Sequence, residues 1–231
     1  MNQRVAKKTM KPHEVPAYGL GEAARYLKIA PATLRSWTLG RTYPLDRGKG
    51  FFEPLITLAG PDGHLLSFAN LVEAHVLRAL RTEHGISVKD VRTAIRYAEK
   101  ELGVDHLLLS PKLRTAERGL FLRKYGTLIN LSRAGQLAME RLLDAHLRRV
   151  EWKVDVPLKL YPFIPEEIAG ANVISINPSV QFGRPVLESR AIKTESIVER
   201  IDAGETVDDL AKDYGVRPEE ITAAIVYERA A

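Results

Sequence analysis

The chain has 231 residues, of which 45% are hydrophobic and 27% are charged, with a formal net charge of +5. This is enough apolar material for one large domain or two smaller ones, which excludes a wholly disordered chain. The absence of cysteine excludes disulfides, thiolate metal ligands and a cysteine nucleophile. No apolar run approaches the roughly 18 residues of a membrane helix, and the charged N-terminus lacks the apolar core of a secretory signal. We therefore expect a cytoplasmic protein without a membrane partner.

Charge is unevenly distributed along the chain. Residues 1–49 hold ten Lys and Arg against three Asp and Glu, whereas residues 172–231 hold seven against eleven. A basic N-terminal end favours a polyanionic partner such as nucleic acid, and an acidic C-terminal end disfavours one. Residues 1–17 taken alone fit a flexible, solvated basic tail equally well.

The segment from Tyr18 to Gly40 predicts two short helices joined by a tight link. The first helix repeats apolar residues at helical spacing, namely Leu20, Ala23, Ala24 and Leu27. Pro31 then occupies the first turn of the second helix, where proline is preferred. On that helix Leu34 and Trp37 share one side and are expected to pack on the first helix.

The opposite side of the second helix carries Ala32, Arg35 and Ser36. A small residue permits close approach to a DNA groove, a guanidinium can bind guanine or a phosphate, and a hydroxyl can bind either. An ordinary helical hairpin with a surface arginine is the alternative. The basic surroundings favour DNA, so the candidate DNA-binding residues are Lys28, Ala32, Thr33, Arg35, Ser36, Arg41, Arg47 and Lys49.

The pattern Leu20…Ala23-Ala24…Leu27…Ile29…Thr33-Leu34-Arg35…Trp37 resembles the helix-turn-helix of MerR-like regulators, and the run after it resembles their wing and following helices. We expect a hairpin with strands at 56–58 and 65–67 around the turn Gly60-Pro61-Asp62-Gly63. Two longer helices should follow, separated by a C-cap at Gly85 and an N-cap at Ser87. The winged domain would span 18–103. The metal-binding cysteines of many such regulators are absent, so metal sensing does not carry over.

Residues 104–171 predict a mixed connector. Phe121–Lys124 and Thr127–Leu131 flank Tyr125-Gly126 and suggest a hairpin. A helix is expected from about Arg133 to Val150, followed by an extended segment from Trp152 to Pro165, in which three prolines exclude a helix.

Residues 172–231 resemble a small family of unknown biochemical function that is often found in VapB-like antitoxins. The resemblance rests on segments such as Phe182-Gly183-Arg184-Pro185-Val186 and Asp213-Tyr214-Gly215-Val216. Cap signals independently predict three helices with helix-turn-helix spacing: one capped by Thr194 and ending at Gly204, one capped by Thr206 and ending at Gly215, and one opened by Pro218.

The third of these helices is unsuited to DNA, because Glu219 and Glu220 would face phosphates. Its other residues, Ala223, Val226 and Tyr227, are expected to be exposed and to form a dimer interface. An ordinary helix surface is the alternative.

Nothing in the sequence favours an enzyme. The six histidines form no His-Glu-x-x-His or other short ligand set, and Gly48-Lys49-Gly50 lacks P-loop spacing. We expect no catalytic residue, no metal and no cofactor.

Together these features predict a mainly α protein with small β-hairpins, built from an N-terminal winged helix-turn-helix and a C-terminal three-helix, helix-turn-helix-like domain. The resemblances imply a type II antitoxin that neutralises a VapC-like PIN-domain ribonuclease, binds operator DNA as an autorepressor and forms a homodimer. Basic residues suited to an acidic toxin site are Arg114, Arg118, Arg123 and Lys124. The alternatives are a stand-alone, ligand-responsive transcriptional regulator and an adaptor that binds no nucleic acid.

Overall fold

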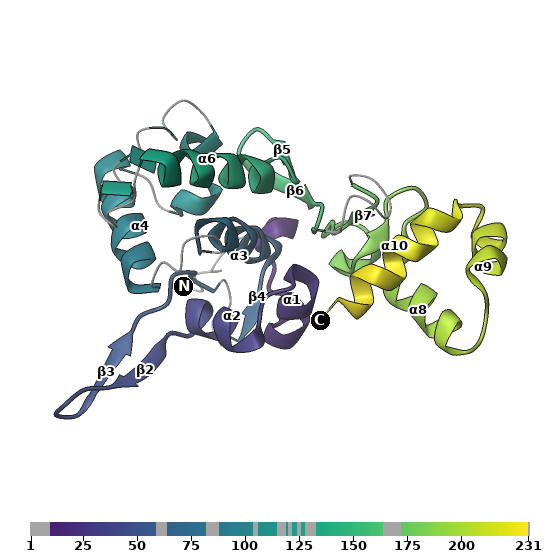
Figure 1. Ribbon diagram of the computed structural model, residues 1–231, viewed down its shortest axis with the longest axis horizontal. Helices are drawn as coiled ribbons and strands as arrows, with labels where there is room; N and C mark the ends of the chain where they lie inside the picture. Colours follow the sequence, from purple (N-terminus) through teal and green to yellow (C-terminus); the bar gives the residue numbers. More distant parts are fainter. Residues whose placement is uncertain are drawn as a thin grey trace, which may run out of the picture.

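The computed structural model describes residues 10–58, 64–81, 88–103, 106–114, 119, 122–123, 126–127, 133–163 and 172–230. It is mostly helical with small antiparallel sheets, as expected. One hydrophobic core joins the N-terminal and middle regions, and a second core lies in the C-terminal region. In Figure 1 these form a larger body, from which one hairpin projects, and a smaller helical body (green to yellow) beside it.

The N-terminal region is built around a buried helix. Its elements in chain order are η1 (Pro12–Glu14), β1 (Tyr18–Gly19), α1 (Leu20–Leu27), α2 (Pro31–Thr38), β2 (Arg41–Pro44), β3 (Lys49–Phe52), β4 (Leu65–Leu66), α3 (Phe68–Arg81) and α4 (Val88–Leu102). Helix α3 is central, because it packs against α1, α4 and α6 (Arg133–Leu147). The two short and two longer helices predicted from the sequence are therefore present.

The hairpin of this region is not where the sequence placed it. Strand β4 pairs with β1, and the hairpin is formed by β2 and β3 in the register Tyr43↔Gly50. Aromatic packing explains the choice, because Tyr43 and Phe52 stack with ring centroids 4.1 Å apart. A Cβ on Gly50 would lie 2.3 Å from Tyr43 Cζ, so glycine is needed there. The predicted turn at 60–63 and the caps at Gly85 and Ser87 lie outside the described residues.

The middle region contains η2 (Leu107–Leu109), η3 (Pro111–Arg114), α6, β5 (Val150–Lys153) and β6 (Val156–Leu160). The predicted long helix is present but ends at Leu147, because Val150 begins β5. The predicted extended segment holds the second half of β5 and all of β6, which pair with each other, and its last two residues lie outside the described residues. Two buried histidines join α3 to α6. His75 Nε2 lies 3.0 Å from the His146 carbonyl oxygen, and burial lowers the pKa of His75 to about 3 and that of His146 to about 4. Both imidazoles are therefore neutral packing groups at pH 7.

The hairpin expected around Tyr125-Gly126 is wrong. The described residues of this segment, Leu122, Arg123, Gly126 and Thr127, are helical. Thr127 Oγ1 donates to the Arg123 carbonyl oxygen, 3.0 Å away and four residues earlier, as in a helix. Short apolar runs are ambiguous between strand and helix, and here the burial of Leu122 in the core goes with the helical form.

The C-terminal region contains β7 (Ile174–Ser175), η4 (Gln181–Gly183), β8 (Val186–Leu187), β9 (Ile192–Lys193), α8 (Thr194–Asp202), α9 (Val207–Tyr214) and α10 (Pro218–Arg229). Thr206 caps α9 by accepting the Asp209 N–H, and Gly215 ends it at φ 63°, as predicted. Thr194 is not a cap. It is the first residue of α8, and its hydroxyl donates to Glu228 Oε1 at 2.5 Å, which ties α8 to α10.

The prediction that Ala223, Val226 and Tyr227 form an exposed face of α10 is also wrong. Ala223 and Tyr227 are 0% and 1% exposed, and Val226 is half-buried. Glu220 is buried as well, where its carboxylate accepts from Ser189 Oγ at 2.6 Å and from the Arg217 N–H at 3.0 Å. Helix α10 carries apolar residues on more than one face. One face fills the C-terminal core, and a second face packs against α1. These residues therefore cannot form the predicted dimer surface.

A matched pair of glycines tests the contact between the two regions. Gly183 and Gly204 both have positive φ, 77° and 100°. A Cβ on Gly183 would lie 2.0 Å from Tyr18 Oη, whereas a Cβ on Gly204 meets nothing within 4 Å. We expect Gly204→Ala to lower the free energy of unfolding by about 1 kcal/mol, and Gly183→Ala by a further ~1–3 kcal/mol from overpacking. Urea denaturation measures both. Equal losses would contradict the close contact.

Candidate DNA-binding surface

The helix-turn-helix is formed by α1, a three-residue link and α2. Lys28 adopts the left-handed conformation, φ 52° and ψ 46°, and its N–H caps α1 through Ala24 and Arg25 carbonyls. Pro31 opens α2. Leu34 and Trp37 are 0% and 2% exposed, so they anchor α2 in the core as the sequence predicted.

The other side of α2 faces solvent. Ala32 and Arg35 are exposed, and Thr33 and Ser36 are half-buried. The order along the helix is therefore a small residue near the N-terminus, then a guanidinium, then a hydroxyl. This face has the size and chemistry of a helix that enters a major groove.

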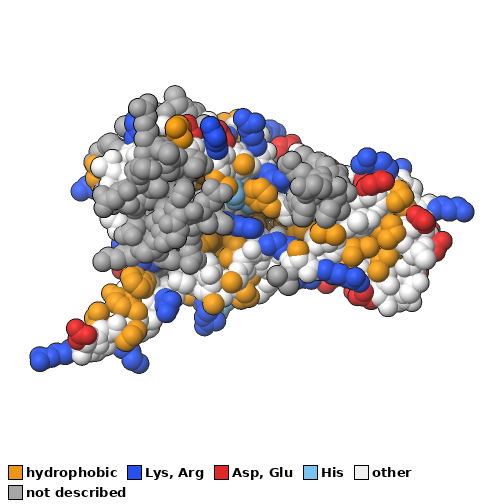
Figure 2. All heavy atoms as spheres, in the orientation of Figure 1, with side chains coloured by type: hydrophobic (Ala, Val, Ile, Leu, Met, Phe, Trp, Pro, Cys, Tyr) orange, Lys and Arg blue, Asp and Glu red, His pale blue; other side chains and the backbone are white. Residues whose placement is uncertain are grey.

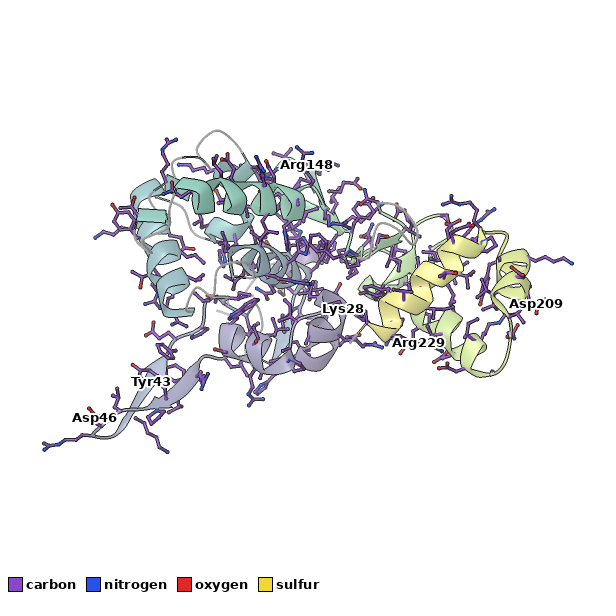
Figure 3. All side chains as sticks on the ribbon, in the orientation of Figure 1. Lys28, Tyr43, Asp46, Arg148, Asp209 and Arg229 are labelled. Carbon is purple, nitrogen blue, oxygen red and sulfur yellow. The ribbon has the colours of Figure 1, made fainter. Side chains whose placement is uncertain are left out.

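The β2–β3 hairpin, here called the wing, begins three residues after α2. Figures 1 and 2 show that it projects from the body, with hydrophobic side chains along it and basic ones near its end. Arg41, Arg47 and Lys49 are all exposed. Asp46 lies in the same turn (Figure 3) and partly offsets their charge. Helix α2 and the wing thus present separate exposed basic groups, and side chains of this kind contact DNA phosphates in winged helix-turn-helix proteins.

Lys28 does not belong to this surface, contrary to the prediction. Its Nζ is buried 4.2 Å from the centroid of the Tyr227 ring and has no hydrogen-bond partner among the described residues. Burial lowers the pKa of this ammonium. The side chain lies in the contact between α1 and α10, so it cannot reach DNA.

That contact, which we call the α1–α10 seam, was not predicted from the sequence. Tyr227 Oη donates to the Tyr26 carbonyl oxygen at 3.0 Å, and burial raises the pKa of Tyr227. At its rim, Arg25 pairs with Glu228 at 3.3 Å. The even spread of apolar residues around α10 was the one sequence signal for a second buried face.

The residues predicted to contact a toxin are only partly described. The Arg114 guanidinium lies 4.2 Å from the centroid of a Trp152 ring and donates to Asp155 Oδ1 at 3.2 Å, so it is engaged within the chain. Arg123 is exposed. Arg118 and Lys124 lie outside the described residues.

Fold and surface together define a helix-turn-helix protein with a separate C-terminal helical domain. Residues 16–95 match the family model described as "Putative DNA-binding HTH domain", and residues 174–227 match "Protein of unknown function (DUF433)". Both matches agree with the resemblances drawn from the sequence.

Relatives of this chain that it matches over most of their length occur in Mycobacterium tuberculosis. The chain is 29% identical over 232 residues to "Putative antitoxin VapB45", covering 92% of this chain and 93% of that protein. It is 25% identical over 222 residues to "Uncharacterized protein Rv2308", covering 92% and 90%. The crystal structure of Rv2018 from the same organism has the same fold, with a TM-score of 0.65 and 22% identity over 91% of this chain and 98% of that one. The expected resemblance to VapB-like antitoxins is confirmed.

Within the described residues, no helix is both long and apolar enough to cross a membrane. Across that same part of the chain, histidine and carboxylate side chains form no group of three that could hold a metal ion.

The buried ammonium of Lys28 generates a stability prediction. Replacing a buried, unpaired charge by an apolar side chain of similar shape is neutral or stabilising, so we expect Lys28→Met to keep or raise the free energy of unfolding. In the wild type, Lys28 has a pKa below 10.5 when folded and the ordinary value of 10.5 when unfolded. At pH values between these two, the unfolded state binds more protons than the folded state. Stability should therefore rise with pH in that window.

Urea denaturation at a series of alkaline pH values measures this slope. It should flatten in Lys28→Met and persist in Lys49→Ala, which removes an exposed lysine instead. A strongly destabilised Lys28→Met protein would show that the ammonium stabilises the seam.

Proposed function

We propose that this protein is an antitoxin that binds operator DNA through its N-terminal domain and represses its own promoter. The observation that carries the proposal is the exposed Arg35 face of α2, set beside a basic wing in a domain that matches a DNA-binding family. The antitoxin part is supported by the similarity to a relative that bears that name over nearly the whole length of both chains.

The DNA interface proposed has two parts. Ala32, Ser36 and Arg35 on α2 read base edges in the major groove, and Arg41, Arg47 and Lys49 hold phosphates. Lys28 is excluded because it is buried in the seam. Operator DNA is commonly bound by two-fold dimers; a homodimer stays a prediction, and it needs a surface other than the buried face of α10.

The partner proposed for the second activity is a VapC-like ribonuclease with an acidic metal site. Such an acidic site attracts a guanidinium and repels a carboxylate. The C-terminal domain is net acidic, so residues 104–165 are the better source of contacts. Within them Arg123 is exposed, and Lys124 follows it in the sequence.

The DNA proposal is tested by two substitutions with opposite signatures. Arg35→Ala should lose about 1–3 kcal/mol of binding free energy for the specific site if its guanidinium contacts a base. Lys49→Ala should weaken binding to all DNA sequences alike. It should also reduce the slope of the logarithm of the binding constant against the logarithm of salt concentration by about 1. Fluorescence anisotropy with operator and scrambled duplexes at several salt concentrations measures both effects.

Two variants serve as controls for that measurement. Arg148→Ala removes the same charge one residue after α6 ends, and Figure 3 labels Arg148 far from the wing. Lys28→Met removes a buried charge. Both should bind DNA as the wild type does. The proposal fails if Arg35→Ala and Lys49→Ala retain wild-type affinity and salt slope.

Toxin neutralisation is tested by co-expression with the toxin-like product of the neighbouring gene. The full chain should restore growth, and the double variant Arg123→Glu/Lys124→Glu should not, because it places carboxylates against an acidic site. Arg148→Glu is the control and should rescue fully. Rescue by the double variant would contradict the assigned contact, and failure of the wild type to bind or rescue would contradict the antitoxin function.

A further inference from the structure

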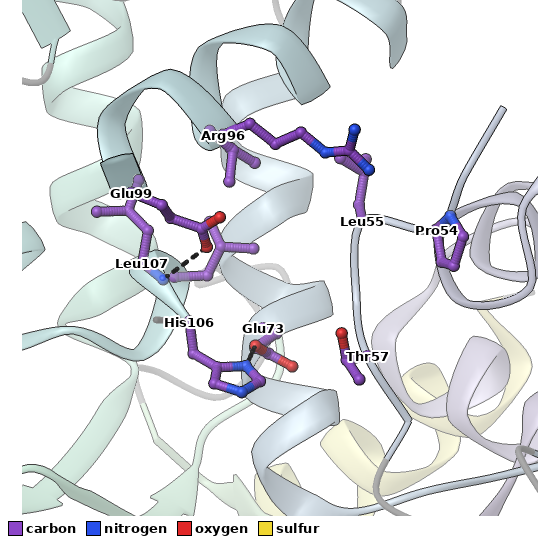
Figure 4. Close-up of a pocket in the computed structure, with 10 residues that line it drawn as sticks. Pro54, Leu55, Thr57, Glu73, Arg96, Glu99, His106 and Leu107 are labelled. Atoms are coloured by element: carbon purple, nitrogen blue, oxygen red, sulfur yellow. Dashed lines mark hydrogen bonds and ion pairs between the residues drawn. The ribbon is translucent and has the colours of Figure 1, made fainter. Parts of the chain in front are cut away.

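A cavity of about 390 Å³ lies between the chain that leaves the wing and helices α3 and α4. Leu55 and Thr57 form its wall on the wing side, and Glu99 of α4 lies opposite (Figure 4). Small-molecule sites span roughly 300–1,000 Å³, whereas one water occupies about 30 Å³ of liquid. The space is therefore large enough for an organic ligand.

The cavity is built around a buried carboxylate. The Glu73 side chain is 4% exposed, and its Oε1 lies 3.0 Å from His106 Nδ1. Its Oε2 accepts from Asn70 Nδ2 at 2.9 Å, and the same amide also donates to the Thr57 carbonyl oxygen at 2.9 Å. Glu73 is thus held rigidly, and its network reaches the wall formed by the wing-side chain.

A second carboxylate faces the same space. Glu99 Oε1 accepts the Leu107 N–H at 3.1 Å, and Figure 4 shows this pair on the wall next to His106. Each carboxylate has about four acceptor positions, so both retain capacity for a ligand. Arg96 also lines the cavity, and its guanidinium pairs with Glu53. The lining is therefore acidic in net terms.

Apolar residues make up part of the remaining lining. Leu55, Ile95 and Leu108 line the cavity beside the polar Thr57. Asn70 and His106 already hold the Glu73 carboxylate, and a carboxylate accepts more hydrogen bonds than these. Two anchored carboxylates beside Leu55, Ile95 and Leu108 match a ligand with one or two cationic groups on a short hydrocarbon chain.

We propose that this cavity binds a small organic cation, an alkyl amine or alkyl guanidinium, whose charged group is bound by Glu73 and Glu99. The hydrocarbon part packs on Leu55, Ile95 and Leu108. An anionic ligand of the same length is excluded by repulsion from the two carboxylates.

The site also adjoins the wing. Glu53 follows β3 directly and is paired with Arg96 of α4, one of the residues that line the cavity. A ligand that presses on Leu55 and Thr57 acts on the chain that leaves the wing. Occupancy therefore changes DNA affinity, a consequence that rests on the proposed DNA-binding function, whereas the cation site itself does not.

Binding is tested by two-dimensional NMR of the uniformly labelled full chain, titrated with agmatine, cadaverine and glutarate. We expect saturable shifts of the Thr57, Glu99 and Leu107 amides with at least one of the two amines and none with glutarate. Glu73→Gln should weaken the amine at least ten-fold, and Glu219→Gln, an exposed carboxylate on α10, should not. If Glu73→Gln does not fold, Glu99→Gln replaces it. No shift with either amine, equal shifts with glutarate, or unchanged binding to the folded variant overturns the site.

Coupling is tested separately by measuring operator affinity with and without saturating amine. The wild type should change its affinity about five-fold or more. Glu73→Gln at the same amine concentration should not, which controls for screening of DNA by the cation. An equal effect in both proteins overturns the coupling to DNA binding but does not overturn the cation site. A chain that binds the amine but no DNA overturns the proposed DNA-binding function instead.

Discussion

The structure depends on the turn at Lys28, where α1 ends and the direction of α2 is set. A left-handed backbone at a non-glycine residue costs free energy of order 1 kcal/mol, and here it is held from the outside. Tyr227 donates to the carbonyl of Tyr26, and its ring covers the Lys28 ammonium. The C-terminal domain therefore contacts the turn that sets the direction of α2, so the position of α2 depends on packing between the two regions.

The charged groups of the chain fall into two sets, those in the contact between α1 and α10 and those on α2 and the wing. Arg25 and Lys28 lie in the seam, where Arg25 pairs with Glu228, so among the basic candidate DNA-binding residues those of α2 and the wing are the exposed ones. The acidic C-terminal domain places its central helix against the DNA-binding domain instead of against solvent. The wing in turn rests on α4 through the Glu53–Arg96 pair. The helix-turn-helix and the wing, which carry the proposed DNA interface, are thus each held by a contact from elsewhere in the chain.

The sequence predicted most helices correctly because their signals are local. Apolar spacing, Pro31 and Pro218 at first turns, and the Thr206 cap all act within a few residues. It misplaced the strands because pairing is decided between segments. Leu65–Leu66 pairs with Tyr18–Gly19, about 47 residues away, and not with its neighbour. The segment near Gly126 was ambiguous by pattern and became helical where Leu122 is buried.

By itself, then, the sequence determined the helical class, the helix-turn-helix, the exposed Arg35 face and the charge asymmetry, since each depends on spacing or composition. Only the tertiary structure decided which polar and aromatic side chains remain exposed to solvent and to binding partners. Lys28, Glu220 and Tyr227 look solvent-exposed by pattern and are buried by packing. Glu73 lies 33 residues before His106 in the chain, and both line one cavity with Glu99. The reason is the same in each case: burial depends on contacts between distant segments, which local periodicity does not encode.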